Sequence, residues 1–164
     1  MATMMTLAKK YQALLSQAQQ RQHPDTDALR LCFQLLSTAG AIDHGCAQRL
    51  APYALSEGRF VMLFLLEAAP AGLSPNALAT QAGITRATVT GLLDGLEKEG
   101  YIVRTPAATD RRSLTIVLTD QGRQLSAQVF AEHTQWMSGL FNALSPEERQ
   151  HMMFLLQKMA TPFN

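Results

Sequence analysis

Charge of one sign, cysteine and long apolar runs are all scarce in this sequence, and each scarcity excludes a class of protein. Its 164 residues carry 14 lysines and arginines against 13 aspartates and glutamates, so any nucleic-acid contact must depend on where the charges lie. Two cysteines are too few for a secreted disulfide scaffold. No charged leader precedes an apolar segment, and no apolar run approaches the roughly 20 residues that span a bilayer. We therefore expect a cytoplasmic protein without membrane partners.

The sequence also lacks the arrangements that catalysis and metal binding require. It contains no Ser/His/Asp set and no glycine loop of the kind that holds phosphates. Its four histidines lack metal-ligand spacing, such as a pair four residues apart with a nearby carboxylate. We expect no catalytic residue, no metal site and no cofactor.

Amphipathic helices account for most of the chain. Apolar residues recur every three or four positions over residues 3–20, 25–50 and 56–68, which predicts three helices. The same spacing predicts a long helix over about 120–143. A capping box with proline at the first helical position, Ser145 to Glu148, begins a last one.

The stretch from residue 74 to 99 predicts two short helices joined by a turn. Ser74 and Pro75 begin the first, which ends before the turn residue Gly83. Thr85 begins the second, over about 85–99. One side of this second helix is apolar (Val89, Leu92, Leu93, Leu96), and the other carries polar groups (Arg86, Thr88, Thr90, Asp94, Lys98). The polar side can donate to phosphates and base edges.

A β-hairpin is predicted directly after this pair of helices. Residues 101–104 and 114–118 are short, β-branched and apolar, as strands are, and the polar loop 105–113 between them contains Asp110, Arg111 and Arg112. The whole pattern predicts a winged helix-turn-helix: mainly α, with a small β-hairpin wing and with further helices at both ends. Such a helix fits the major groove of B-DNA, and arginines of the wing reach an adjacent minor groove.

The motifs in this stretch resemble those of the MarR (multiple antibiotic resistance regulator) family of transcription factors. Asp110-x-Arg112, followed after five residues by Leu118-Thr119, is similar to the family's wing motif. Residues 84–90 look like its recognition helix. Leu55-Ser56 with Phe60, and Thr119-x-x-Gly122-Arg123, also match, so the resemblance covers roughly residues 55–125.

The resemblance and the residue pattern together imply a DNA-binding regulator and a set of contact residues. Asp110 is expected to orient the wing loop while Arg112 enters the minor groove. For Arg104 and Arg123, phosphate contacts and structural ion pairs are both open. The expected DNA-binding residues are Ser74, Thr85, Arg86, Ala87, Thr88, Thr90, Arg104, Asp110, Arg111 and Arg112.

Three segments of the chain are expected to have separate roles in dimerisation and DNA binding. Residues 1–54 and 120–164 carry large apolar helix faces, which indicates a twofold homodimer, and residues 55–119 form the DNA-binding domain. Two recognition helices related by a twofold axis predict an inverted-repeat operator with half-sites about 10 bp apart. The function expected is that of a ligand-responsive regulator, most simply a repressor.

Two kinds of effector are open. His44, Arg49 and Phe60 lie near the predicted junction of dimer helices and winged domain, where the resemblance implies a pocket for small aromatic acids. An exposed Arg49 and a core Phe60 are the alternative. Cys32 and Cys46 are interpreted as buried core residues, with oxidation sensing as the alternative. About 21 Å of helix, at roughly 1.5 Å per residue, separates them and excludes a bridge within the chain. A bridge between subunits or a sulfenate stays open.

A different class of function remains possible because a fold alone does not determine function. An enzyme or a protein-docking module can use the same winged fold without binding DNA. The missing catalytic sets disfavour the enzyme. A measurement of duplex binding distinguishes the docking module, which does not bind DNA, from the regulator, which does.

Overall fold

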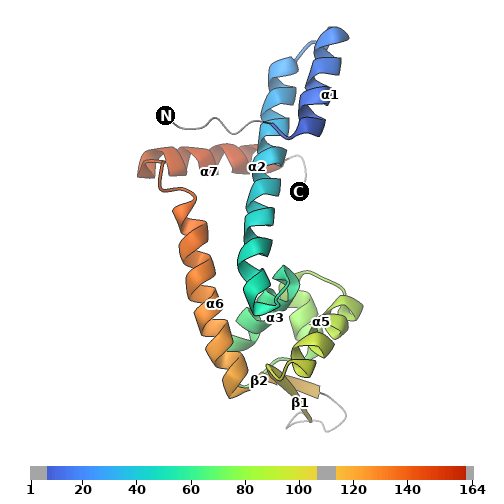
Figure 1. The fold of residues 1–164 in the computed structure, drawn as a ribbon, viewed down its shortest axis with the longest axis vertical. Helices are drawn as coiled ribbons and strands as arrows, with labels where there is room; N and C mark the ends of the chain where they lie inside the picture. Colours follow the sequence, from blue (N-terminus) through green and yellow to red (C-terminus); the bar gives the residue numbers. More distant parts are fainter. Residues whose placement is uncertain (1–6, 107–113, 162–164) are drawn as a thin grey trace. The chain divides into compact units, whose positions relative to one another are not determined.

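A computed structural model of the chain describes residues 7–106 and 114–161 (Figure 1). It divides into two compact units, Met1–Glu57 and Gly58–Asn164. The described residues form helices and one two-stranded antiparallel sheet, so the predicted fold class, mainly α with a β-hairpin wing, is confirmed. No helix in these two ranges is long and apolar enough to cross a membrane.

The first unit is a pair of helices, α1 (Lys9–Gln20) and α2 (Thr26–Leu50), followed by the short 3-10 helix η1 (Ala51–Tyr53). The two long helices lie side by side, with the ring of Tyr11 stacked on that of Phe33 at 5.2 Å. As predicted, α2 begins after Asp25, whose carboxylate accepts the N–H of Ala28 at 2.8 Å.

The second unit contains the winged helix-turn-helix. Its helices α3 (Glu57–Glu67), α4 (Pro75–Ala82) and α5 (Arg86–Lys98) precede strands β1 (Ile102–Pro106) and β2 (Leu114–Leu118). The strands pair with Val103 opposite Val117. The sequence-based prediction ended the first strand at Arg104, whereas β1 continues to Pro106, because that residue pairs with Leu114.

The core of this unit is aliphatic and comes from every element of the winged fold. Each of its side chains is at most 2% exposed: Met62, Leu63, Leu66, Leu78, Val89, Leu93, Leu96, Ile102 and Ile116. Leu73, just before α4, exchanges two backbone hydrogen bonds with Ile116, at 3.0 and 2.8 Å. This bridge fixes the start of α4 to the hairpin, a contact that the sequence did not predict.

The wing leads into α6 (Asp120–Gly139), which runs away from the hairpin in Figure 1 and is followed by α7 (Pro146–Ala160). The predicted end of α6 at about residue 143 is wrong, because a turn replaces the helix after Gly139. Helix α7 has the predicted capping box but no buried residue, and it exposes Met153, Phe154 and Leu155 by about half or more.

Candidate nucleic-acid interface

The turn between α4 and α5 is built from local hydrogen bonds. Ser74 Oγ accepts the N–H of Ala77 at 3.2 Å and begins α4. Gly83 adopts φ +65°, the left-handed conformation that ends a helix, and Ile84 N donates to Ala79 O at 3.1 Å. Thr85 Oγ1 then accepts the N–H of Thr88 at 3.2 Å and begins α5. The predicted positions of both helices are confirmed.

Helix α5 has one buried and one exposed side. Val89, Leu93 and Leu96 are at most 1% exposed and hold the helix to the core. All four predicted contact residues of its first turns, Arg86, Ala87, Thr88 and Thr90, are exposed. The helix therefore presents a polar surface, free of bulky apolar groups, that a groove of DNA can accept.

The exposed groups of α5 differ in what they offer a ligand. Thr90 Oγ1 donates to Arg86 O at 3.0 Å, so its hydroxyl faces solvent as an acceptor beside a methyl group. Thr88 Oγ1 lies 2.8 Å from Thr85 Oγ1. Among residues 7–106 and 114–161 no carboxylate pairs with Arg86, and this guanidinium is the cation that α5 presents in its first turn.

Arg104 connects the wing to α5. Its guanidinium, on β1, forms ion pairs with Asp94 and, at 3.4 Å, with Glu97. Of the two roles left open for Arg104, this geometry favours the structural ion pair, because two carboxylates already match its charge. The pairs also cancel negative charge that α5 would otherwise present next to a phosphate backbone.

Arg123, in the first turn of α6, connects that helix to the base of the wing, much as Arg104 connects β1 to α5. It donates from Nη1 to the carbonyl of Leu118, the last residue of β2, at 2.8 Å, and it forms an ion pair with Asp120. The N-terminus of α6 is fixed to the same place, because Thr119 N donates to Tyr101 O at 3.0 Å. The wing is thus held at both strands.

The remaining predicted DNA contacts, Asp110, Arg111 and Arg112, lie outside the described residues. The segment that contains them joins Pro106, the last residue of β1, to Leu114, the first residue of β2. Their contacts with DNA stay a prediction.

The residues predicted to bind an aromatic acid divide between the two units. In the first unit, His44 Nε2 lies 3.0 Å from Gln48 Nε2, and Arg49 donates to Gly45 O at 3.3 Å. In the second, the half-buried ring of Phe60 lies 5.0 Å from that of His133, which is 5% exposed and 5.7 Å from Trp136. The ligand site stays a prediction. The aromatic cluster was missed, although the three-residue spacing of His133 and Trp136 could have indicated it.

The two cysteines differ in environment, and both are free thiols. Cys32 is exposed, so its interpretation as a buried core residue is wrong. Cys46 is half-buried, and burial, followed by the nearby carboxylates of Glu57 and Asp43, raises the pKa of its thiol. A raised pKa disfavours the thiolate that reacts with peroxide. Within the described ranges no group of three His, Cys, Asp or Glu could hold a metal ion.

Comparison with known proteins agrees with this geometry. Residues 55–114 match the family model described as the MarR family. The HTH-type transcriptional repressor YetL of Bacillus subtilis (strain 168) is 32% identical over 148 residues, which are 90% of this chain and 89% of YetL.

Two solved structures extend the comparison to ligands. The Staphylococcus aureus MepR-DNA complex has a TM-score of 0.69 at 27% identity, covering 82% of this chain and 96% of MepR. CouR of Rhodococcus jostii RHA1, bound to p-coumaroyl-CoA, has a TM-score of 0.66 at 26% identity, covering 80% and 92% of the two chains.

Proposed function

Because the chain belongs to the MarR family of DNA-binding transcriptional regulators, we propose that it is a homodimeric repressor that binds an inverted-repeat operator. The observation that carries this proposal is the exposed polar side of α5, with Arg86, Thr88 and Thr90, above a fully buried apolar stripe. The repressor role is supported by the name of the relative YetL, and duplex binding by the MepR-DNA complex.

In this proposal Arg86 and the two threonines contact the major groove, and Arg111 and Arg112 of the wing contact an adjacent minor groove. Ser74 lies at the N-terminus of α4, where free backbone N–H groups favour a phosphate. The ion pairs of Arg104 join β1 to α5, which supports a joint role for the wing and the helix in DNA binding. An enzymatic role is set aside, since family members are regulators.

Dimerisation completes the operator contact. Proteins of this family are dimeric, and residues 1–54 and 120–164 carry the apolar helices assigned to that role here. A twofold axis places two copies of α5 on half-sites about one helical turn, or roughly 10 bp, apart. Once one recognition helix is bound to its half-site, the second helix is held near the other half-site at a high effective concentration.

For release from the operator we propose a small aromatic carboxylate, and His44, Arg49 and Phe60 are each kept as a predicted contact residue for it. The p-coumaroyl-CoA in the CouR structure carries an aromatic acyl group, which supports the aromatic part of this ligand; the carboxylate part rests on the histidine and arginine alone. Oxidation of Cys32 or Cys46 is the alternative signal, and the exposure of Cys32 is the observation that favours retaining it. A thermal-shift screen of aromatic carboxylates, repeated with peroxide, distinguishes the two. A rise in melting temperature with one acid supports the aromatic carboxylate. A change in melting temperature with peroxide that requires Cys32 or Cys46 supports oxidation sensing.

The DNA-binding proposal is tested by measuring duplex affinity at several salt concentrations. Arg86→Ala and Arg112→Ala should each weaken binding, and loss of a phosphate contact lowers the slope of log K against log salt by about 1. Arg21→Ala removes an exposed cation from the first unit and serves as the matched control. If both interface variants bind duplex like the control variant, the chain is better explained as a protein-docking module.

A further inference from the structure

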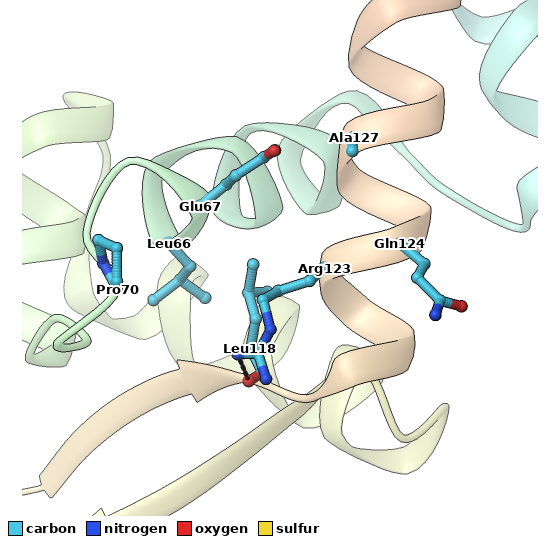
Figure 2. Close-up of a pocket in the computed structure, with 7 residues that line it drawn as sticks. All are labelled: Leu66, Glu67, Pro70, Leu118, Arg123, Gln124 and Ala127. Carbon is cyan, nitrogen blue, oxygen red and sulfur yellow. Dashed lines mark hydrogen bonds between the residues drawn. The ribbon is translucent and has the colours of Figure 1, made fainter.

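A cavity of about 370 Å³ lies between the end of α3, the end of β2 and the first turns of α6 (Figure 2). Every residue that lines it belongs to the second unit. Leu66, Pro70, Leu118 and Ala127 supply apolar walls, and Glu67 and Arg123 supply opposite charges. Mostly apolar walls with a few fixed polar groups are typical of small-molecule sites, and this volume is within their usual range of about 300–1,000 Å³.

The two charged groups are not equally satisfied. Arg123 donates to the carbonyl of Leu118, as the dashed line in Figure 2 shows, and it pairs with Asp120, so its charge is matched. Among residues 7–106 and 114–161, Glu67 accepts a hydrogen bond only from the neutral hydroxyl of Ser126, and no cation forms an ion pair with it. The charge left for a ligand to match is therefore negative.

The carboxylate of Glu67 is also held in place. Ser126 Oγ donates to Glu67 Oε2 at 2.5 Å, and Ser126 is only 1% exposed, so the hydroxyl is fixed by the packing around it. This leaves Oε1 of a half-buried carboxylate for another donor. Glu67 is also the last residue of α3, where the helix dipole adds negative potential. An oriented anion beside apolar walls attracts a cation that carries an apolar body.

We propose that this cavity binds a small organic amine. Its protonated nitrogen donates to Glu67, and its apolar body lies against Leu66, Pro70 and Leu118. The site differs in residues and in ligand charge from the predicted aromatic-acid site. Leu118 ends β2, so a bound amine contacts the base of the wing. Any effect of the amine on DNA affinity rests on the proposed function, whereas its binding does not.

Calorimetric titration with 2-phenylethylamine tests the site. Two compounds of similar shape serve as controls, the neutral 2-phenylethanol and the anionic 3-phenylpropanoate. The amine should bind most tightly. Glu67→Gln keeps the shape and an acceptor for Ser126 but removes the charge, and it should weaken amine binding by about tenfold, as expected for one charge-assisted hydrogen bond. Glu132→Gln, the same change at an exposed position of α6, should not alter it.

A second variant tests the location. Ala127→Phe fills the cavity from the exposed surface of α6, so amine binding should be lost while the thermal melt stays cooperative. The proposal is overturned if the amine does not bind at millimolar concentration, if Glu67→Gln binds it as wild type does, or if the carboxylate binds more tightly. Duplex binding is measured on the same samples. Amine binding by a chain that does not bind duplex supports this site and removes only the proposed function.

Discussion

At the scale of single residues, side chains that close a local hydrogen bond define the recognition element. Thr85 is exposed and contributes no apolar burial, yet its hydroxyl accepts the Thr88 N–H where α5 begins. A threonine in this position stabilises the helix whether or not it also contacts DNA, so stability and DNA affinity must be measured separately.

Thr85→Ala should lower the free energy of unfolding by about 1 kcal/mol, because the N–H of Thr88 loses its acceptor. Thr85→Ser keeps the hydroxyl and should stay near wild type. Urea unfolding followed by circular dichroism measures both. Equal stability of the alanine and serine variants would show that the cap contributes nothing.

Cys46 is a residue for which the structure predicts a pH dependence. Its thiol pKa is raised, chiefly by burial, so the thiolate fraction at neutral pH is lower than in an ordinary cysteine. In the Cys32→Ser protein, alkylation by iodoacetamide should accelerate as pH rises, with a midpoint above that of a cysteine peptide. A midpoint below that of the peptide would contradict this environment and strengthen the oxidation-sensing alternative.

At the scale of elements, the wing and α5 act together because two ion pairs hold them. Arg104 joins β1 to Asp94 and Glu97 of α5, and all three side chains are more than a quarter exposed, so the pairs stabilise the fold by no more than about 1 kcal/mol. Their larger effect is electrostatic, at the surface that meets DNA.

Arg104→Gln should weaken duplex binding because it exposes two uncompensated carboxylates on α5. Adding Asp94→Asn to that variant should then recover part of the affinity. Fluorescence anisotropy with a labelled operator duplex measures both steps. If the second substitution recovers nothing, Arg104 contacts a phosphate directly, which is the other role predicted for it.

The joint between hairpin and α6 depends on a glycine. A Cβ atom at Gly122 would lie 1.9 Å from the carbonyl oxygen of Tyr101, so no side chain fits unless the backbone moves. Gly122→Ala should cost about 2 kcal/mol of stability or more. The matched change Gly91→Ala, with nothing within 4 Å of its Cβ, should be neutral or stabilising by up to about 1 kcal/mol. Thermal denaturation measures the stability of both variants. Equal losses of stability in Gly122→Ala and Gly91→Ala would reject this explanation.

At the scale of the whole molecule, the chain exposes more apolar surface on its last helix than a monomer would retain. Helix α7 buries nothing, and Phe154 is 58% and Met153 57% exposed. A large exposed apolar surface marks an interaction site, and a second copy of the chain is the partner proposed here.

Phe154→Asp should convert the dimer to a monomer at micromolar concentration without unfolding the second unit, because the side chain supports no core. Affinity for a full inverted repeat should fall much more than affinity for a half-site. Phe154→Leu retains the apolar surface and should stay dimeric. Light scattering after size-exclusion chromatography measures the molar mass of each variant. If Phe154→Asp is still a dimer, the interface lies elsewhere.

The positions of the helices were predictable because their ends are determined locally. Ser74, Gly83, Thr85 and Ser145 each act within a few residues, through a side-chain cap or a left-handed φ, and the structure has helix ends at those points. The predicted end of α6 was wrong because the helix ends at Gly139 without a left-handed C-cap, since Leu140 keeps φ −58°, and no local signal marks that position.

The sequence by itself determined the succession of helices, the hairpin and the polar side of α5, since each follows from periodicity and capping over a few residues. Only the tertiary structure decided that Arg104 meets Asp94, that Phe60 packs on His133 and that Ser126 orients Glu67 across 59 residues. Such pairs depend on how distant elements pack, and a pattern along one helix carries no information about the helix that will cover it.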